Sequence, residues 1–340
     1  MDISDKSSGK CFFGARDGNN LLKKNMAEQI SVIEFEKLEA IPKTLMLELT
    51  NSCNHSCLFC YHKQSKRKPT AMKPEFAMRI IDEAYELGVR RLALYLLGEP
   101  FLYRYLIDII KYAKQKKYEY VYLTTNGALA NSNLMKDVID AGLDSVKFSI
   151  DAIDKDNYCA VHGVDDFATV YNNLMWLYDY KIKNDLPIQV YVSSVLTKYN
   201  EDKEAICNVF KDKCDELVIV DLENPAGMIQ NIGDLLKNEK QSLAIHRREL
   251  PCSMVFNRIH VTAEGLLTAC CADFENNLVY ADLNEQDLVT AWNNEIITYL
   301  RNMHLCGDVY GTLCYNCVND EKNHVAYSPI QHLLKERNSC

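Results

Sequence analysis

The sequence predicts an α/β fold in which six strand–helix units form a partial barrel or a doubly wound sheet, followed by a smaller region built on a β-hairpin. From Thr44 onward, short apolar runs alternate with amphipathic segments, which is the pattern of repeated βα units. The segments between the runs contain helices long enough for parallel crossovers. After Pro251 the pattern changes to a hairpin around Gly265. A chain of 340 residues is long enough to bury a core for both parts.

Six apolar runs are the expected strands. They are TLMLELT (44–50), RLALYLL (91–97), YEYVYLTT (118–125), SVKFSID (145–151), IQVYVSSVLT (188–197) and ELVIVD (216–221). Two of the intervening helices are marked by apolar residues on one face and a glycine after the last turn: Phe76, Ile80, Ala84 and Leu87 before Gly88, and Leu134, Val138 and Ala141 before Gly142. Both candidate folds place functional residues at the C-terminal ends of the strands.

The remaining segments complete a predicted division of the chain. Residues 1–43 are an N-terminal extension with one helical candidate, Glu28 to Leu38, and residues 44–225 are the strand–helix unit. A linker helix is expected in 226–250, a hairpin-plus-helix domain in 251–320 with its helix from Glu285 to Met303, and a tail in 321–340. The hairpin domain is small, so we expect a metal to help hold it together.

Composition and charge exclude several classes of protein. Apolar residues make up 48% and charged residues 25% of the chain, as in soluble globular proteins. The net charge of −9 argues against a nucleic-acid partner. No run reaches the ~20 apolar residues that span a membrane, and no signal-peptide core stands near the start, so we expect a cytoplasmic protein without a membrane partner. The basic cluster Lys63, Lys66, Arg67 and Lys68 is either a solvated loop or a lip that attracts an anionic substrate.

The cysteines carry the main functional signal. In a reducing compartment the chain's 14 cysteines indicate metal binding or catalysis rather than disulfides. Cys53, Cys57 and Cys60, in CNHSCLFC, directly follow the first strand. Their thiolates suit zinc or an iron–sulfur cluster. A structural zinc completed by His55 or His62 remains an alternative, although three thiols in one loop differ from the usual two pairs.

This CxxxCxxC spacing, with the aromatic Phe59 before the last cysteine, resembles the motif of the radical S-adenosylmethionine (radical SAM) superfamily. The resemblance implies that the three thiolates hold a [4Fe-4S] cluster and leave one iron open to chelate S-adenosylmethionine. An electron from the reduced cluster then cleaves the cofactor to a deoxyadenosyl radical. The resemblance covers about Thr44 to Asp221 and implies a partial (β/α)6 barrel of the TIM type.

Further matches follow in the order of the family's motifs. Gly98, Glu99 and Pro100 in YLLGEP resemble the GGEP element that meets the amino group of the cofactor, with Leu97 in place of the first glycine. The remaining matches resemble the ribose and carboxylate contacts of the family, and they are Asn126 in LTTNG, Ser149 and Asp151 in FSID, and Ser194 or its neighbour Ser193. Taken singly, each of these motifs is also explained by ordinary turn chemistry.

A second group of cysteines resembles the SPASM/Twitch pattern of auxiliary iron–sulfur domains. Cys252 and Cys270 flank Gly265 at the expected spacing, and CYNC supplies Cys314 and Cys317. The resemblance implies a second [4Fe-4S] cluster in the shorter Twitch form, as in dehydrogenases of aminocyclitols, whereas a zinc ribbon would use the same four thiols. The neighbouring thiols Cys271 and Cys306 are candidates for a spare ligand or a hydrogen-atom donor.

Together these motifs predict a radical SAM oxidoreductase or epimerase that removes a C–H hydrogen from a sugar, aminocyclitol or related polyol. Transfer of the next electron to the auxiliary cluster would give dehydrogenation, and hydrogen donation by a thiol would give epimerisation. Maturation of a ribosomally made peptide is the alternative, and a non-catalytic metal or electron-transfer protein is the second. We expect a flavodoxin- or ferredoxin-type protein as the electron donor.

Overall fold

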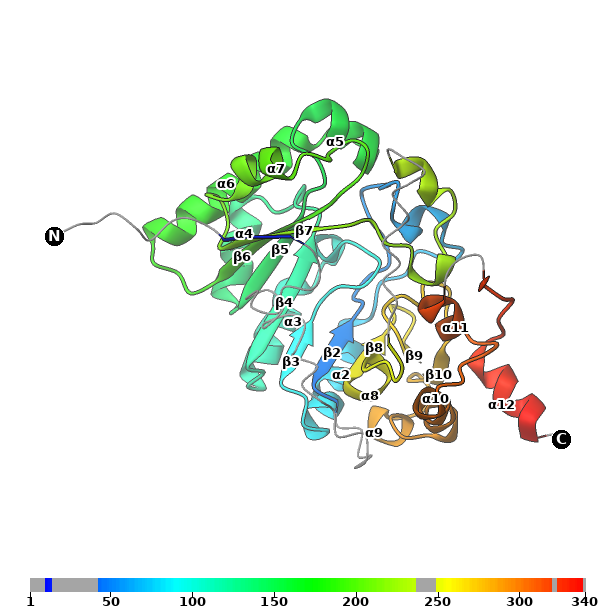
Figure 1. Ribbon diagram of the computed structural model, residues 1–340. Coiled ribbons are helices and arrows are strands. Elements are labelled where there is room, and N and C mark those ends of the chain that lie inside the picture. The colour runs from blue at the N-terminus through cyan, green and yellow to red at the C-terminus, as the bar shows by residue number, and fades with distance from the viewer. Residues whose placement is uncertain (1–9, 14–41, 237–248, 320–322, 339–340) are drawn as a thin grey trace.

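A computed structural model describes residues 10–13, 42–236, 249–319 and 323–338 (Figure 1). The helical candidate at 28–38 lies outside these residues. The six predicted strands are all present, each shorter than its apolar run: β2 (Thr44–Leu47), β3 (Arg91–Ala93), β4 (Tyr120–Thr125), β5 (Ser145–Ser149), β6 (Gln189–Val195) and β7 (Glu216–Val220). The helices among them are α2 (Pro74–Glu86), α3 (Leu106–Gln115), α4 (Ser132–Asp140), α5 (Lys155–His162), α6 (Phe167–Lys183) and α7 (Lys203–Phe210).

The order of these strands decides between the two predicted folds. Strands β2 to β7 lie side by side in chain order, and every neighbouring pair is parallel. A doubly wound sheet would reverse its strand order at a switch point, whereas here the order runs on unbroken, as in a barrel. The fold is therefore a partial TIM-type barrel. An unpredicted strand, β1 (Lys10–Phe13), pairs in parallel with β7, and its four residues are too few to show a period.

The two faces of this sheet have different surroundings. On the outer face, alternate strand residues pack against helices such as α2, whose Ala77, Ile80, Ile81 and Ala84 are buried. On the inner face a smaller group packs together, which we call the inner cluster and define as Met46, Ala93, Tyr122, Tyr191 and Val218. Paired residues of neighbouring parallel strands point to the same side of the sheet. Residues that pair in register with members of the inner cluster therefore also face inward.

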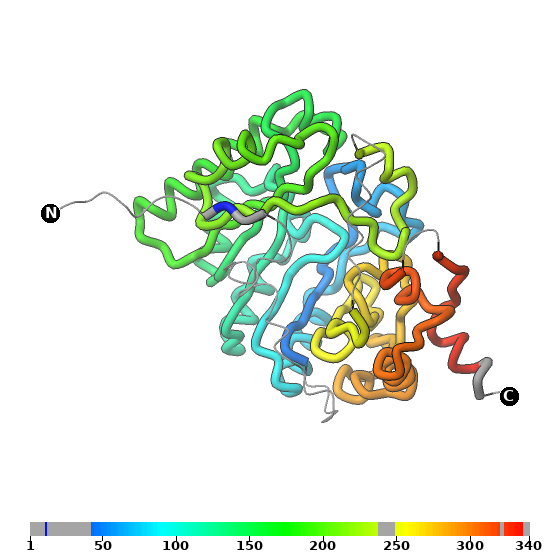
Figure 2. Tube along the Cα trace, viewed as in Figure 1, coloured from blue at the N-terminus to red at the C-terminus, as the bar shows by residue number. Residues whose placement is uncertain are grey.

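The C-terminal region extends the same sheet. The predicted hairpin is present as β8 (Arg258–Val261) and β9 (Leu266–Thr268), and Gly265 between them has a φ of +87°. Strand β8 pairs in parallel with β2, and β10 (Val279–Asp282) pairs with β9. In Figure 2 the blue trace of β2 runs beside the yellow trace of the hairpin. Val261, Leu267 and Trp292 belong to the core cluster of the barrel, so the region does not depend on a separate core of its own.

The predicted helix from Glu285 to Met303 is in fact two helices, α9 (Leu288–Ala291) and α10 (Glu295–Cys306). The break occurs because Asn294 accepts hydrogen bonds from the backbone N–H groups of Ile296 and Ile297 and so caps a new helix. The remaining helices of the described region are α8 (Met254–Asn257), α11 (Leu313–Val318) and α12 (Ile330–Asn338). None of the described helices combines the length and apolar character that crossing a membrane requires.

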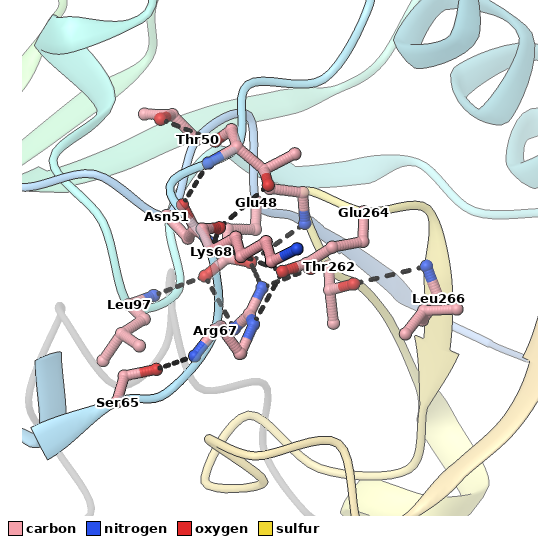
Figure 3. A network of polar contacts seen from close by, with 12 residues as sticks. Glu48, Thr50, Asn51, Ser65, Arg67, Lys68, Leu97, Thr262, Glu264 and Leu266 are labelled. Atoms are coloured by element: carbon pink, nitrogen blue, oxygen red, sulfur yellow. Dashed lines mark hydrogen bonds and ion pairs between the residues drawn. The ribbon is translucent and has the colours of Figure 1, made fainter.

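A buried ion-pair network joins the barrel to the hairpin (Figure 3). Arg67 lies between the carboxylates of Glu48, at the end of β2, and Glu264, in the hairpin turn. Its side chain is only 7% exposed, and that of Glu48 is 1% exposed. Burial opposes ionisation of Glu264, but hydrogen bonds and charge from Arg67 outweigh it and lower the pKa of Glu264. Arg67 therefore belongs neither to a solvated loop nor to a lip.

Glu48 also organises the backbone around this network. One carboxylate oxygen accepts a hydrogen bond from the N–H of Leu97 at 3.1 Å, and the other accepts one from the N–H of Ala263 at 2.9 Å. The side chain of Asn51 donates to Glu264 at 3.2 Å and to the carbonyl of Lys68 at 2.8 Å. The hairpin is thus contacted at one point by three segments, which lie before Cys53, after Cys60 and after β3.

We predict that Arg67→Met lowers the free energy of unfolding by about 3–5 kcal/mol, because two carboxylates would lose their shared cation inside the protein. Chemical unfolding followed by circular dichroism measures this change. Lys155→Met is the matched control, since Lys155 pairs with Asp165 at an exposed position and its loss should leave stability unchanged. A loss below about 1 kcal/mol for Arg67→Met, the range of exposed pairs, would contradict the prediction.

Candidate active site

The cysteine loop begins just after β2 and is fastened to the C-terminal end of α5. The N–H of Ser56 donates to the carbonyl of His162 at 3.1 Å, and the N–H of Leu58 donates to that of Val161 at 2.9 Å. Gly163 follows α5 with a φ of +74°, and a Cβ there would lie 2.2 Å from the Ser56 hydroxyl. The lack of a side chain at this position is what lets the loop lie so close to the helix.

The three thiols of this loop are partly buried and influence one another. Burial, together with a smaller effect of Cys53, raises the pKa of Cys60 to about 11. Burial also raises the pKa of Cys57, as do Cys60, Asp151 and Cys53. Thiols in such surroundings must lose their protons when a cluster binds, so binding is coupled to proton release. The donor set of three soft sulfurs on one loop fits an iron–sulfur cluster with one iron left open.

His162 links Cys57 to the end of β5. Its Nδ1 lies 3.1 Å from the Cys57 sulfur, and its Nε2 accepts a hydrogen bond from the N–H of Asp151 at 3.3 Å. Burial lowers the pKa of His162 to about 3, so the ring is neutral. Nε2 also lies 3.4 Å from the Asp151 carboxylate. With the ring proton assigned to Nδ1, the ring would donate a hydrogen bond to the sulfur. No sequence motif predicted this contact, because His162 stands alone in a helix.

Gly98 and Glu99 lie directly against the cysteine loop. A Cβ on Gly98 would be 2.2 Å from the carbonyl oxygen of Thr50, and the N–H of Glu99 donates to the carbonyl of Ser52 at 2.8 Å. The buried Glu99 carboxylate accepts hydrogen bonds from the hydroxyl of Thr125 at 2.8 Å and the N–H of Asn126 at 2.9 Å. Burial raises the pKa of Glu99 to about 7.

Three further predicted residues lie nearby. The side-chain amide of Asn126 donates to Asn54 at 2.8 Å and lies 3.8 Å from the Cys53 sulfur. Pro100 is buried and begins a 3₁₀ turn, Pro100–Leu102. Phe59 packs edge-on to His162, with ring centroids 6.4 Å apart.

The predicted linker covers Phe59 from another side. Its described part contains a 3₁₀ turn, Ile232–Leu235, and residues 237–248, where most of the predicted helix falls, lie outside the described chain. Ile232 and Leu235 belong to an apolar cluster against which Phe59 packs. The segment therefore adds an apolar wall to the cysteine loop.

Three predicted residues at the strand ends have different surroundings. Ser149 is half-buried, and its hydroxyl lies 3.5 Å from Asp151. Asp151 is fully buried, and burial raises its pKa to about 7, although it accepts a hydrogen bond from the N–H of Val195 at 2.6 Å. Ser194 pairs in register with Ile219 of the outer core and bonds to Asn200. Ser193 instead pairs with Ser149 and shares its inner face, so the geometry favours Ser193 over Ser194.

The four predicted auxiliary cysteines come together around one cavity. Cys252, Cys270, Cys314 and Cys317 line it, along with His304 and apolar side chains such as Leu278. Burial raises the pKa of Cys314, and Cys252 and Cys317 raise it further. Cys306, an exposed residue at the end of α10, is not among the lining residues. The convergence of four thiols from three separate segments fits a second cluster.

Asp273, which was not predicted, organises the turn after Cys270. Its buried carboxylate accepts hydrogen bonds from the hydroxyl of Thr268 and from the N–H groups of Asn277 and Leu278. These bonds hold the end of β9, and with it the cysteine, against the start of β10.

The two neighbours Cys270 and Cys271 have different surroundings. Cys270 lines the auxiliary cavity, whereas Cys271 packs against the inner cluster and lies near Tyr95. The segment Cys270–Cys271 therefore lies between the auxiliary cavity and the inner cluster.

The arrangement of thiols also bears on the zinc alternatives. Among the residues that the structure describes, no three His, Cys, Asp or Glu side chains gather closely enough to hold a single metal ion. A structural zinc ion needs such ligands gathered around one point, so within these residues neither cysteine group forms a compact single-ion site.

We predict that Gly98→Ala weakens binding of S-adenosylmethionine at least about tenfold, because overpacking of about 1–3 kcal/mol would push the two loops apart. Equilibrium dialysis with the reconstituted protein measures the affinity. In Gly233→Ala, the control, the added Cβ meets nothing within 4 Å. Equal affinities for the two variants would show that close approach at Gly98 is not required.

We predict that His162→Phe lowers the reduction potential of the cluster at Cys57, because an N–H group that donates to a cluster sulfur stabilises the more negative reduced form. A redox titration followed by electron paramagnetic resonance measures the potential. His162→Gln offers an N–H donor at the same position and should keep the potential closer to that of the wild type. A potential that is the same in all three proteins would rule out the N–H···S contact.

Comparison with known proteins agrees with this geometry. The radical SAM superfamily profile matches residues 47–209, and an iron–sulfur cluster-binding SPASM domain matches residues 252–318. A "Probable GTP 3',8-cyclase" of Sulfurisphaera tokodaii is 27% identical over 286 residues, or 74% of this chain and 88% of that protein. Another, of Thermoplasma volcanium, is 36% identical over 121 residues, which is only 36% of each chain.

Two solved structures share the fold. A complex of BtrN with AdoMet and 2-DOIA has a TM-score of 0.52 at 18% identity, covering 77% of this chain and 87% of that one. Streptococcus suis SuiB bound to its precursor peptide SuiA has a TM-score of 0.61 at 16% identity, covering 77% and 67%. The two matched domains imply a cluster that binds S-adenosylmethionine, the cofactor itself and an auxiliary iron–sulfur cluster. Since these domains together occupy more than half of the 340 residues and contain both cysteine groups, the chain belongs to the radical SAM superfamily and carries a SPASM iron–sulfur domain.

Proposed function

We propose that this chain is a radical SAM oxidoreductase or epimerase that acts on a C–H bond of a sugar, an aminocyclitol or a related polyol. The observation that carries the proposal is the contact of Cys271 with the inner cluster, next to Cys270 in the auxiliary cavity. A substrate inside the barrel would lie between the cysteine loop at the strand ends and this second site. The proposal groups the protein functionally with the dehydrogenases of aminocyclitols.

Each group of residues has a definite role in this proposal. Cys53, Cys57 and Cys60 hold the catalytic cluster, and Nδ1 of His162 lies 3.1 Å from the sulfur of Cys57. The auxiliary cluster is held by four cysteines, which are Cys252, Cys270, Cys314 and Cys317. When bound, these groups and S-adenosylmethionine supply a radical that removes hydrogen and an acceptor for a second electron.

The cofactor cradle is formed by residues at the strand ends. Gly98 allows the close approach of the loop, and the N–H of Glu99 fastens it to Ser52. Beyond Glu99 and Pro100 the cradle includes Asn126, Ser149 and Ser193, while Phe59 forms an apolar wall. Asp151 orients the site through Val195 and His162. Burial of these groups keeps water from the reacting atoms.

Two other substrates are supported by a specific comparison. The structural likeness to SuiB with its bound precursor peptide supports a peptide substrate. The relatives named as GTP 3',8-cyclases support a nucleotide, since one alignment spans 74% of this chain. We propose a flavodoxin- or ferredoxin-type electron donor in each case, and a cytoplasmic protein without nucleic-acid or membrane partners. A role without catalysis is disfavoured because an electron carrier has no use for a cofactor cradle at Gly98 and Glu99.

The test begins with anaerobic reconstitution with iron and sulfide. We predict about eight irons in the wild type and about four in a variant with Cys53, Cys57 and Cys60 all changed to Ala, which would also lose cleavage of S-adenosylmethionine. Cys314→Ala/Cys317→Ala is the complementary variant and should lose the auxiliary irons. Bound zinc in place of iron, or cleavage that survives the triple change, would contradict the proposal.

The same reduced enzyme is then offered sugars, aminocyclitols, GTP and candidate precursor peptides. Dehydrogenation appears as a mass loss of two hydrogens, and epimerisation as uptake of deuterium from the solvent. We expect turnover of a polyhydroxylated small molecule. Turnover of peptides alone would overturn the carbohydrate assignment, and cyclisation of GTP alone would place the chain with its cyclase relatives.

A further inference from the structure

Lys147 is a cation on the inner face of the barrel that no role described above uses. It lies in the middle of β5, where the register pairs it with Thr124 of β4 and with Tyr191 of the inner cluster. Ser149 follows it by two residues on the same face. Because a strand rises about 3.3 Å per residue, Lys147 lies about 6.6 Å deeper in the barrel than Ser149.

The ammonium group has no direct partner within the described part of the chain. Nζ makes no hydrogen bond and no ion pair there, and Asp151 influences it only as a nearby charge. The Asp151 carboxylate is itself engaged by the N–H of Val195 and the hydroxyl of Ser149. Lys147 is half-buried, so its side chain reaches accessible space.

The surroundings make this charge costly unless an anion meets it. Burial disfavours the charged form of Lys147 and lowers its pKa, against a smaller opposing effect of Asp151. Its neighbours on the inner face are the neutral side chains of Thr124 and Tyr191, which cannot neutralise a cation. A partly buried charge is usually paired, and a lysine without a partner inside a barrel is the exception.

We infer that Lys147 binds an anionic group of the substrate, either a phosphate or a carboxylate, inside the barrel. The inference rests on the proposed function, because it takes the barrel interior as the substrate site, and it narrows the substrate class. Within the proposed class, sugar phosphates and sugar acids meet the requirement, whereas neutral polyols and aminocyclitols without an acidic group do not. The depth of Lys147 below Ser149 places this group beneath the expected cofactor contacts at the strand ends.

The test measures binding of inorganic phosphate and of acetate to the reconstituted enzyme loaded with S-adenosylmethionine. We expect Lys147→Met to weaken binding of at least one anion about tenfold or more, and by far more than it weakens binding of the cofactor. Lys147→Arg keeps the charge and should restore much of the affinity. Lys183→Met, at an exposed position of α6, removes the same charge elsewhere and should behave like the wild type. The anion that binds more tightly shows whether the substrate carries a phosphate ester or a carboxylate.

Two outcomes would overturn the inference. Equal anion binding in the wild type and Lys147→Met would remove Lys147 from the site. A parallel loss of cofactor affinity in Lys147→Met would assign the ammonium to the carboxylate of S-adenosylmethionine instead. Failure of the proposed function would be seen separately. In that case the wild type itself would not cleave S-adenosylmethionine, whatever residue stands at position 147.

Discussion

The ion pairs of Arg67 with Glu48 and Glu264 set the relation between the two halves of this protein. Desolvating three charged groups is expensive, and the expense is offset only when each charge keeps its partner in good geometry. The hairpin turn that carries Glu264 can therefore take few positions relative to the end of β2. Since Glu48 also bonds to Leu97 and Ala263, the same constraint extends to the loop that carries Gly98.

The continuous sheet also ties the C-terminal region to the barrel. Parallel pairing of β2 with β8 gives the small C-terminal region the core that its size alone would not supply. Of the auxiliary cysteines, Cys270 follows β9 closely and is thereby tied to the barrel sheet, whereas Cys314 and Cys317 lie in α11. A radical enzyme needs such attachment, since its reacting groups must keep their geometry while water is excluded.

Local periodicity was sufficient to predict the six barrel strands and the hairpin at Gly265, because each is encoded by neighbouring residues. It could not predict contacts between distant residues. Cys57 and His162 are 105 positions apart, and Arg67 and Glu264 are 197 positions apart, so only the folded chain brings either pair together. The choice between Ser193 and Ser194 could not be made from the sequence for another reason: both are small and polar, and only the strand register shows which one faces inward.

Under the proposed function, the position of Cys271 connects the architecture to the outcome of the reaction. Oxidation requires an electron to leave the substrate radical, whereas epimerisation requires a hydrogen atom to reach it. Cys270 belongs to the auxiliary cavity and Cys271 to the surroundings of the inner cluster, so adjacent residues of one segment border both routes. The two outcomes then differ by small shifts in where the substrate carbon lies relative to this segment. Residues that position the substrate, rather than those that hold the clusters, would therefore determine which product forms.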